Sequence, residues 1–285
     1  MRLLALAAAV WMTTVAFAQD KQLAALHATL LKLRAAGPNY ETNGASPELT
    51  VAKHQLRDWI ETQLAPLDNA VDEKALSDRI NHELSAVNVA GEKDDQNLLG
   101  SLDEVRISRE SGPLIITTGV GILCQYDDSA YGYKLVNRRW QRIWESEQND
   151  YSSKKYAPQH IAAVHVWQWF EDGQEDGPPF VLTLGYEVGC ASTWHPVYYR
   201  VWRVDSSGSK LLIDGSEEAW LRAGDFAVGS VAQDPRDKNS PVDVLVEFTV
   251  RSIDGGVHSR EAIRHFLING LSAGIRENLQ MSMIQ

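Results

Sequence analysis

Side chains that could do chemistry lie in three short polar segments between residues 127 and 261. Listed by segment, they are Asp127 and Asp128, then Trp194 and His195, then His258, Arg260 and Glu261. The carboxylates and imidazoles could transfer protons or hold a divalent cation, and Arg260 could clamp an anionic ligand. Together these residues form the candidate ligand-binding site. The alternative is that they are ordinary turn residues, because Asp, Ser and Gly favour turns for backbone reasons.

No short motif in the chain assigns a reaction. The G-x-S-x-G, G-x-x-x-x-G-K-[ST] and paired-cysteine zinc patterns are all missing from the sequence. His82 and Glu83 could begin a zinc-protease motif, but Ala86 stands where the second histidine is needed. Gly119 and Gly121 begin like a dinucleotide-binding loop, but the third glycine is replaced by cysteine. The sequence therefore identifies no catalytic residue, metal site or cofactor.

The polar segments follow copies of one apolar segment. Residues 113–124 (PLIITTGVGILC) recur 66 positions later as residues 179–190 (PFVLTLGYEVGC). A weaker third copy, displaced by a further 63 residues, carries Val181 onto Val244 and His195 onto His258. Self-similarity at a fixed spacing indicates one supersecondary unit used several times. If the units surround an axis, their equivalent loops converge on one face and bring the candidate residues together.

The two cysteines, Cys124 and Cys190, occupy equivalent positions of the first two copies. Two cysteines in an exported protein permit one disulfide. A bridge, however, needs Cα atoms within about 7 Å of each other, and equivalent positions of adjacent units are usually further apart. A disulfide and a pair of buried thiols therefore both stay open.

Each copy belongs to a unit of about four short strands, in which apolar and polar residues alternate. The expected strands cover residues 105–108, 114–119, 131–136 and 140–145, then 161–170, 180–186, 197–204 and 210–214, then 226–232, 242–250 and 261–268, with another near Ile275. Such antiparallel units resemble β-propeller blades, but propellers close with about four to eight blades. The three expected units could instead form an open stack or a twisted sandwich. Copies of the chain could also assemble into an oligomer that closes a ring.

The segment before the strands has helical spacing of apolar residues. Three apolar stripes are expected: Leu23, Leu26, Leu30 and Leu33; Leu49, Ala52, Leu56, Ile60 and Leu64; Leu76, Ile80, Leu84 and Val87. We expect a helical segment at residues 19–91, a charged linker at 92–100 and the β-domain at 101–285, an α+β and mainly β fold. The helices should pack on the β-domain, where an open sheet edge needs a cover.

Composition and the first residues limit the location and the partners. Residues 1–18 have a basic start, a short apolar run and a small-x-small end, which predicts a signal peptide and export to the periplasm or beyond. No apolar run is long enough to predict a membrane span. With 38 acidic against 27 basic residues the formal charge is −11, which argues against nucleic acid and anionic membranes as partners.

Two functions remain open at the level of sequence. The first is a non-enzymatic exported protein that binds a protein or polysaccharide through repeat loops on one face. The alternative is a secreted hydrolase or lyase acting on glycans with acid and histidine groups from the same loops. Most of the nine tryptophans fall in the β-region, where they could fill the core or, as at Trp194, stack on sugar rings.

Overall fold

The computed structural model describes residues 2–37, 46–89, 98–109, 112–123, 125–149, 158–168, 179–187, 195–205, 208–219, 227–232, 242–251, 257–269, 272–275 and 280–283. For residues 2–18, 167–168, 187, 195–196 and 217–219, and for the described residues beyond 219, it describes the backbone alone. Helices precede antiparallel strands along the chain, and strands predominate. The expected α+β, mainly β fold is therefore confirmed at this level.

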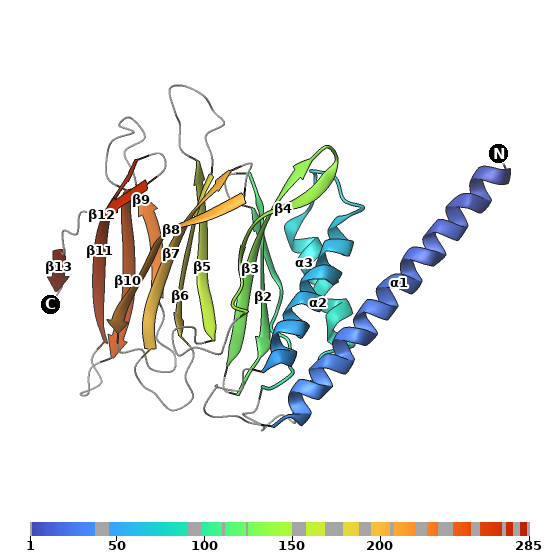
Figure 1. Cartoon of the computed structure of the whole chain (residues 1–285), viewed down its shortest axis with the longest axis horizontal. Helices are drawn as coiled ribbons and strands as arrows, with labels where there is room; N and C mark the ends of the chain where they lie inside the picture. The colour runs from blue at the N-terminus through green and yellow to red at the C-terminus, as the bar shows by residue number, and fades with distance from the viewer. Residues whose placement is uncertain are drawn as a thin grey trace.

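The helices gather at one end of the molecule (Figure 1). They are α1 (Arg2–Ala35), α2 (Pro47–Leu64) and α3 (Glu73–Ser85). Helix α2 opens with Pro47 and has Glu48 in its first turn. Helix α3 is capped by Asp72, whose carboxylate accepts a hydrogen bond from Ala75 N.

Helix α1 runs without a break through the residues assigned to a signal peptide, and that assignment stays a prediction. No helix in the described part of the chain combines the length and the apolar character needed to cross a membrane.

The strands form three antiparallel sheets in chain order. Sheet 1 contains β1 (Arg106–Arg109), β2 (Leu114–Gly121), β3 (Tyr126–Val136) and β4 (Arg139–Ser146), and sheet 2 contains β5 (Gln159–Gln168), β6 (Pro179–Glu187), β7 (His195–Asp205) and β8 (Gly208–Ala219). Sheet 3 contains β9 (Ala227–Ala232), β10 (Val242–Arg251) and β11 (Val257–Asn269), with β12 (Ser272–Ile275) and β13 (Gln280–Met283) both paired to β11. None of these described sheets closes on itself.

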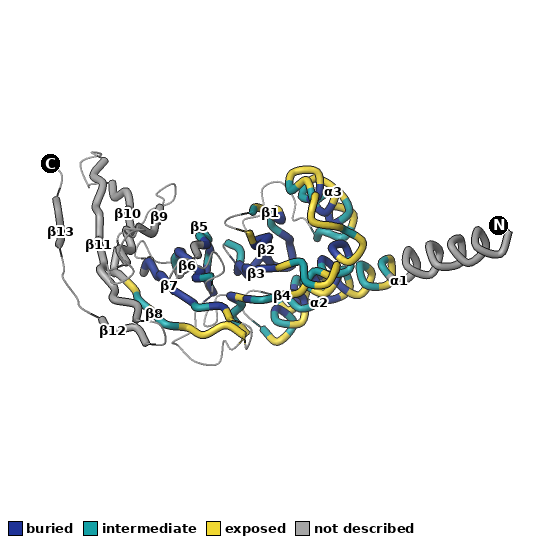
Figure 2. Tube along the Cα trace, turned by 90° about the horizontal axis from the view of Figure 1, so that it is seen from above, coloured by how far each residue is buried: buried dark blue, intermediate teal, exposed yellow. Residues whose placement is uncertain are grey.

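The sheets lie one behind the other along the long axis of the molecule, with the helices beyond sheet 1 (Figure 1). Strand β2 is buried on both faces, as Figure 2 shows. Its residues Leu114, Ile116 and Val120 join the core of the helices, whereas Ile115 packs with Trp144 and residues of sheet 2. Alternation along a strand explains this division. The helices therefore pack on the β-region as expected, but they cover a face of sheet 1, where the sequence suggested an edge.

The edge of sheet 1 is completed by two asparagine side chains. Asn81 of α3 donates to Val105 O and accepts from Val105 N, at 2.9 and 2.8 Å, just before edge strand β1. Asn88 does the same for Leu102, at 3.2 and 2.8 Å. Each amide thus supplies the donor and the acceptor that a neighbouring strand would supply, which leaves these backbone groups closed to another chain.

Two glycines of the second strands, 66 positions apart in the chain, each face a longer side chain on the third strand of their sheet. Gly119 lies opposite Asp128, and Gly185 lies opposite Tyr198. A Cβ atom added to Gly119 would lie 2.6 Å from Asp128 Oδ1, and one added to Gly185 would lie 2.5 Å from the Tyr198 hydroxyl and collide with the His160 carbonyl. Both positions require glycine because a larger side chain from the facing strand fills the space.

Candidate functional site

Asp127 and Asp128 do not lie in a loop, because β3 already begins at Tyr126. Both side chains are fully buried. Asp127 Oδ1 accepts a hydrogen bond from Gln159 N at 3.0 Å, and Asp128 Oδ2 accepts one from Ile161 N at 2.9 Å. The two carboxylates therefore bind main-chain donors of β5, the edge strand of sheet 2. The expected polar loop at this point is wrong, and both acids hold sheet 2 against sheet 1.

Asp128 also faces a histidine of sheet 2. His160 Nδ1 lies 2.9 Å from Asp128 Oδ2, and the His160 ring packs on Tyr186 with centroids 4.8 Å apart. Burial raises the pKa of the Asp128 carboxyl above its ordinary value, against the opposing effect of the bonds from His160 and Ile161 N. The carboxyl is thus placed for sheet docking and is closed to solvent.

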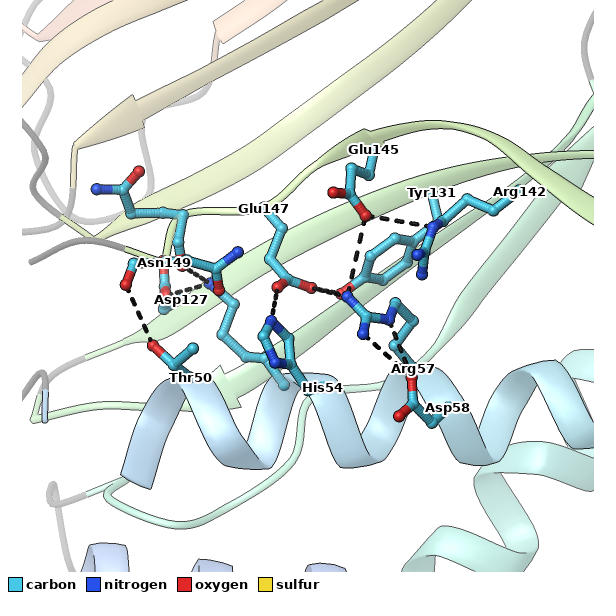
Figure 3. Close-up of polar contacts among 12 residues, drawn as sticks. Thr50, His54, Arg57, Asp58, Asp127, Tyr131, Arg142, Glu145, Glu147 and Asn149 are labelled. Atoms are coloured by element: carbon cyan, nitrogen blue, oxygen red, sulfur yellow. Dashed lines mark hydrogen bonds and ion pairs between the residues drawn. The ribbon is translucent and has the colours of Figure 1, made fainter. Parts of the chain in front are cut away.

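Helix α2 presents a polar stripe to sheet 1, and Figure 3 labels three of its members, Thr50, His54 and Arg57. Its members are Thr50, Lys53, His54, Arg57 and Glu61, spaced three or four residues apart. Lys53 is the most deeply buried, with 1% of its side chain exposed. Its ammonium donates to Asp127 Oδ2 at 2.8 Å and to Gln148 O at 2.7 Å. A buried lysine with a carboxylate partner satisfies the rule that buried charges are paired.

Glu147, which follows β4, is the centre of a second group that contacts the same stripe (Figure 3). Its side chain is 1% exposed and lies 2.8 Å from His54 Nε2, while the Tyr131 hydroxyl donates to its other oxygen. Arg57 lies 3.7 Å away. Burial would raise the pKa of Glu147, but the bond from Tyr131 and the charges of Lys53 and His54 together hold that pKa below its ordinary value.

The pKa of the Tyr131 hydroxyl shifts in the opposite direction from that of Glu147. Burial and the adjacent Glu147 carboxylate raise its pKa well above the ordinary value, so it remains a neutral donor. His54 is more accessible to solvent than Glu147 and Tyr131, since 41% of its side chain is exposed. A solvent-exposed imidazole held by a buried carboxylate is an arrangement that can act as a general base or acid.

The remaining predicted site residues come from sheets 2 and 3. His195 is the first residue of β7, and His258, Arg260 and Glu261 lie within β11. Arg260 and Glu261 are consecutive, and consecutive positions of a strand belong to opposite faces of a sheet. Trp194, Cys124, Cys190 and the acidic segment 171–176 lie outside the described residues.

The backbone pairing also corrects the relation between the two histidines. At the sequence spacing of 63, Thr183 of β6 corresponds to Val246 of β10. Thr183 pairs with Arg200 and Val246 with Ala262, so the third strands align at 262 − 200 = 62. His195 then corresponds to 195 + 62 = 257, which is Val257. His195 and His258 are therefore not at equivalent positions, because His258 lies one residue beyond the position that corresponds to His195.

Several functional candidates were missed by the sequence analysis, namely Lys53, His54, Arg57 and Glu147. The three on α2 share a helical spacing that the sequence shows beside the leucine stripe, so that signal was available. Glu147 follows β4 and carries no local signal. Among the described residues no group of three or more metal-ligating side chains could hold a metal ion.

Trp144 of sheet 1 and Trp202 of sheet 2 lie in the core between these sheets, whereas Trp140 is partly buried against the helices. Trp144 and Trp202 pack edge to face with centroids 5.4 Å apart, and each is largely buried.

Comparison of the chain with protein-family models, with curated proteins and with solved structures finds no match.

Proposed function

We propose that the protein is an exported, non-enzymatic binding protein, whose stacked sheets form a frame for a protein or polysaccharide partner. The observation that carries this proposal is the use of Asp127 and Asp128, since both carboxylates bind the main chain of β5 inside the protein. The alternative of a glycan-acting hydrolase or lyase relied on acidic side chains that included these two. Both are buried, so neither is available to a substrate.

The frame itself is proposed to consist of three related units, arranged as an open, propeller-like stack. Gly119 of β2 and Gly185 of β6, which are 66 positions apart and lie in the second strand of their sheets, support this for the first two units. The meander order of β5 to β8 repeats that of β1 to β4. Rigid units of this kind present their connecting loops without large rearrangement.

Contact with the partner is proposed at the segments that lead into β7 and β11, with Trp194, His195, His258, Arg260 and Glu261 as contact residues. His195→Ala with His258→Ala should leave stability within about 1 kcal/mol, as substitutions at exposed sites usually do. Urea denaturation of the purified double variant measures this. A loss of several kcal/mol would show that the histidines are buried structural groups.

The binding function is tested by probing a glycan array and an extract of exported proteins with the mature chain. A binding protein should retain a defined glycan or protein partner, and Trp194→Ala should weaken that binding. Tyr186→Phe is a matched aromatic change elsewhere and should leave binding intact. If neither probe retains any partner, the proposed function is wrong.

A glycan-acting hydrolase or lyase is the second candidate, favoured by the His54–Glu147 pair. In that case His54 acts as general acid or base, and Glu147 orients it. Release of reducing ends from a panel of polysaccharides tests this candidate. His54→Ala should then abolish turnover, while Lys74→Ala on the exposed side of α3 should not. If the unchanged chain releases no reducing ends from any of the polysaccharides, the hydrolase or lyase candidate is wrong.

Export itself is tested by expressing the full chain with its first residues intact. The intact mass of the exported product should correspond to a chain that begins at Gln19. A product that keeps residues 1–18 and stays inside the cell would contradict the assignment.

A further inference from the structure

The hairpin of β3 and β4 carries a cluster of exposed cations, although the whole chain is acidic. Lys134, Arg138 and Arg139 are all exposed and lie within six positions of one another. Lys134 pairs with Gln141 and Val136 pairs with Arg139 across the hairpin. Paired residues share a face of a sheet, so Lys134 and Arg139 belong to one face, with Arg138 at the turn between the strands. We call these three residues the basic tip.

The opposite face of the hairpin is fixed to the helices, beside which it lies in Figure 1. Trp140 donates its indole N–H to Leu67 O at 3.2 Å, and the Tyr133 hydroxyl donates to Glu61. Arg142 forms ion pairs with Glu61 at 3.0 Å and with Glu145 at 3.3 Å. Arg142 is thus neutralised within the protein. No ion pair among the described residues involves a member of the basic tip.

The turn gives a second, independent observation. Asn137 has φ of 51° and Arg138 has φ of 62°, so both central residues adopt the left-handed conformation of a type I′ turn. Asparagine tolerates this conformation, and glycine is the favoured residue at the second position. Arginine is strained there. A residue that breaks a local backbone preference at an exposed position points to a functional role for its side chain.

We propose that the basic tip binds an acidic polysaccharide through its carboxylate or sulfate groups. Guanidinium groups form paired hydrogen bonds with such planar or tetrahedral anions. The proposal rests on the proposed binding function and names its ligand class. It also assigns the contact to the hairpin, in addition to the segments before β7 and β11.

The size of the cluster distinguishes this ligand from other polyanions. Nucleic-acid sites make about 6–10 phosphate contacts, and lipid-binding segments carry about 4–8 basic residues. Three cations at one turn fit a short run of acidic sugars. The net charge of −11 does not oppose this, because charges more than about 8 Å away are screened at physiological salt.

The test measures binding of the mature chain to polygalacturonate, dextran sulfate and neutral dextran by biolayer interferometry over a range of salt. The unchanged chain should bind both acidic polymers and not neutral dextran. Lys134→Ser with Arg138→Gly and Arg139→Ser should weaken binding more than about tenfold, since charge-assisted hydrogen bonds are lost. Arg138→Gly alone should weaken binding while raising the melting temperature, because glycine relieves the turn. Because Arg138→Gly should be at least as stable as the unchanged chain, weaker binding by this variant would not result from unfolding.

A charge-matched control is Lys32→Ser with Lys74→Ser and Arg79→Ser, three exposed cations on the helices. It should bind as the unchanged chain does. Equal weakening in both triple variants would overturn the proposal, because the effect would then follow net charge. Binding to neutral dextran alone would leave the binding function standing and remove the basic tip as its site. Binding to anionic vesicles or duplex DNA without binding to the acidic polymers would also overturn it.

Discussion

Lys53 links helix α2 to sheet 1 through a charge that is buried on both sides. Its ammonium contacts Asp127 and the main chain at Gln148. Removing one partner of a buried ion pair leaves the other charge uncompensated and costs about 3–5 kcal/mol. We therefore expect Lys53→Met to destabilise the fold by that amount in urea denaturation. The exposed Lys74→Met should have no measurable effect, and a similar result for Lys53→Met would contradict the structural role.

Glu147 predicts a dependence of stability on pH. Its folded-state pKa lies below the ordinary value of 4.5, although burial alone would raise it. A carboxyl with a lowered folded pKa stabilises the fold above its unfolded pKa, and this contribution is lost as pH falls through the folded pKa. Glu147→Gln should therefore flatten the loss of stability below about pH 4.5. Asp128 has the opposite sign, but it is present in both proteins and cancels in the comparison.

The measurement is the free energy of unfolding of both proteins at a series of acidic pH values. Parallel curves for Glu147→Gln and the unchanged chain would show that Glu147 has the same pKa in the folded and unfolded states.

At residue scale the sequence could not reveal what Asp127 and Asp128 do. Two acids followed by serine are typical of a turn, and local propensity cannot tell a turn from the start of a buried strand. Their partners lie far away in the chain, at Lys53 and at Gln159 and Ile161. The burial of both acids is decided by contacts that only the fold creates.

At the scale of elements, most strands were predicted, because alternation and turn residues are local signals. Their bounds differ at β3, which begins at Tyr126 where 131 was expected, and at β8, which extends to Ala219 where 214 was expected. The additional strand β13 was missed, since nothing local marks its pairing with β11. The apolar stripes of the helices were also predicted, and Leu49, Leu56 and Ile60 are all buried.

The paired glycines predict a difference between the two sheets. Gly185→Ala would push its new methyl group against the main-chain carbonyl of His160, which cannot move away easily. Gly119→Ala would meet the Asp128 carboxylate and other side-chain atoms. Overpacking of this kind costs about 1–3 kcal/mol. We expect Gly185→Ala to be the more destabilising change in thermal unfolding, and the reverse order would contradict the close approach of the His160 carbonyl to Gly185.

At the scale of the whole molecule, the helices act as the end cover of the sheets. Leu114, Ile116 and Val120 of β2 form one core with α1, α2 and α3. Deleting residues 19–97 would expose this face, and exposed apolar patches of that kind cause association. We expect the shortened chain to be insoluble or aggregated, as measured by its soluble fraction and by light scattering. A soluble monomer would contradict the cover role.

The hydrogen bonds from Gln159 and Ile161 to the acids of sheet 1 have a kinetic consequence. Edge strand β5 obtains acceptors for these two donors only after β3 and its carboxylates are in place. Sheet 1 is thus a template for sheet 2, and a chain that emerges amino end first can build each layer on the one already formed. Assembly in that direction keeps every new edge exposed for the shortest time, which limits the period in which two growing chains could join.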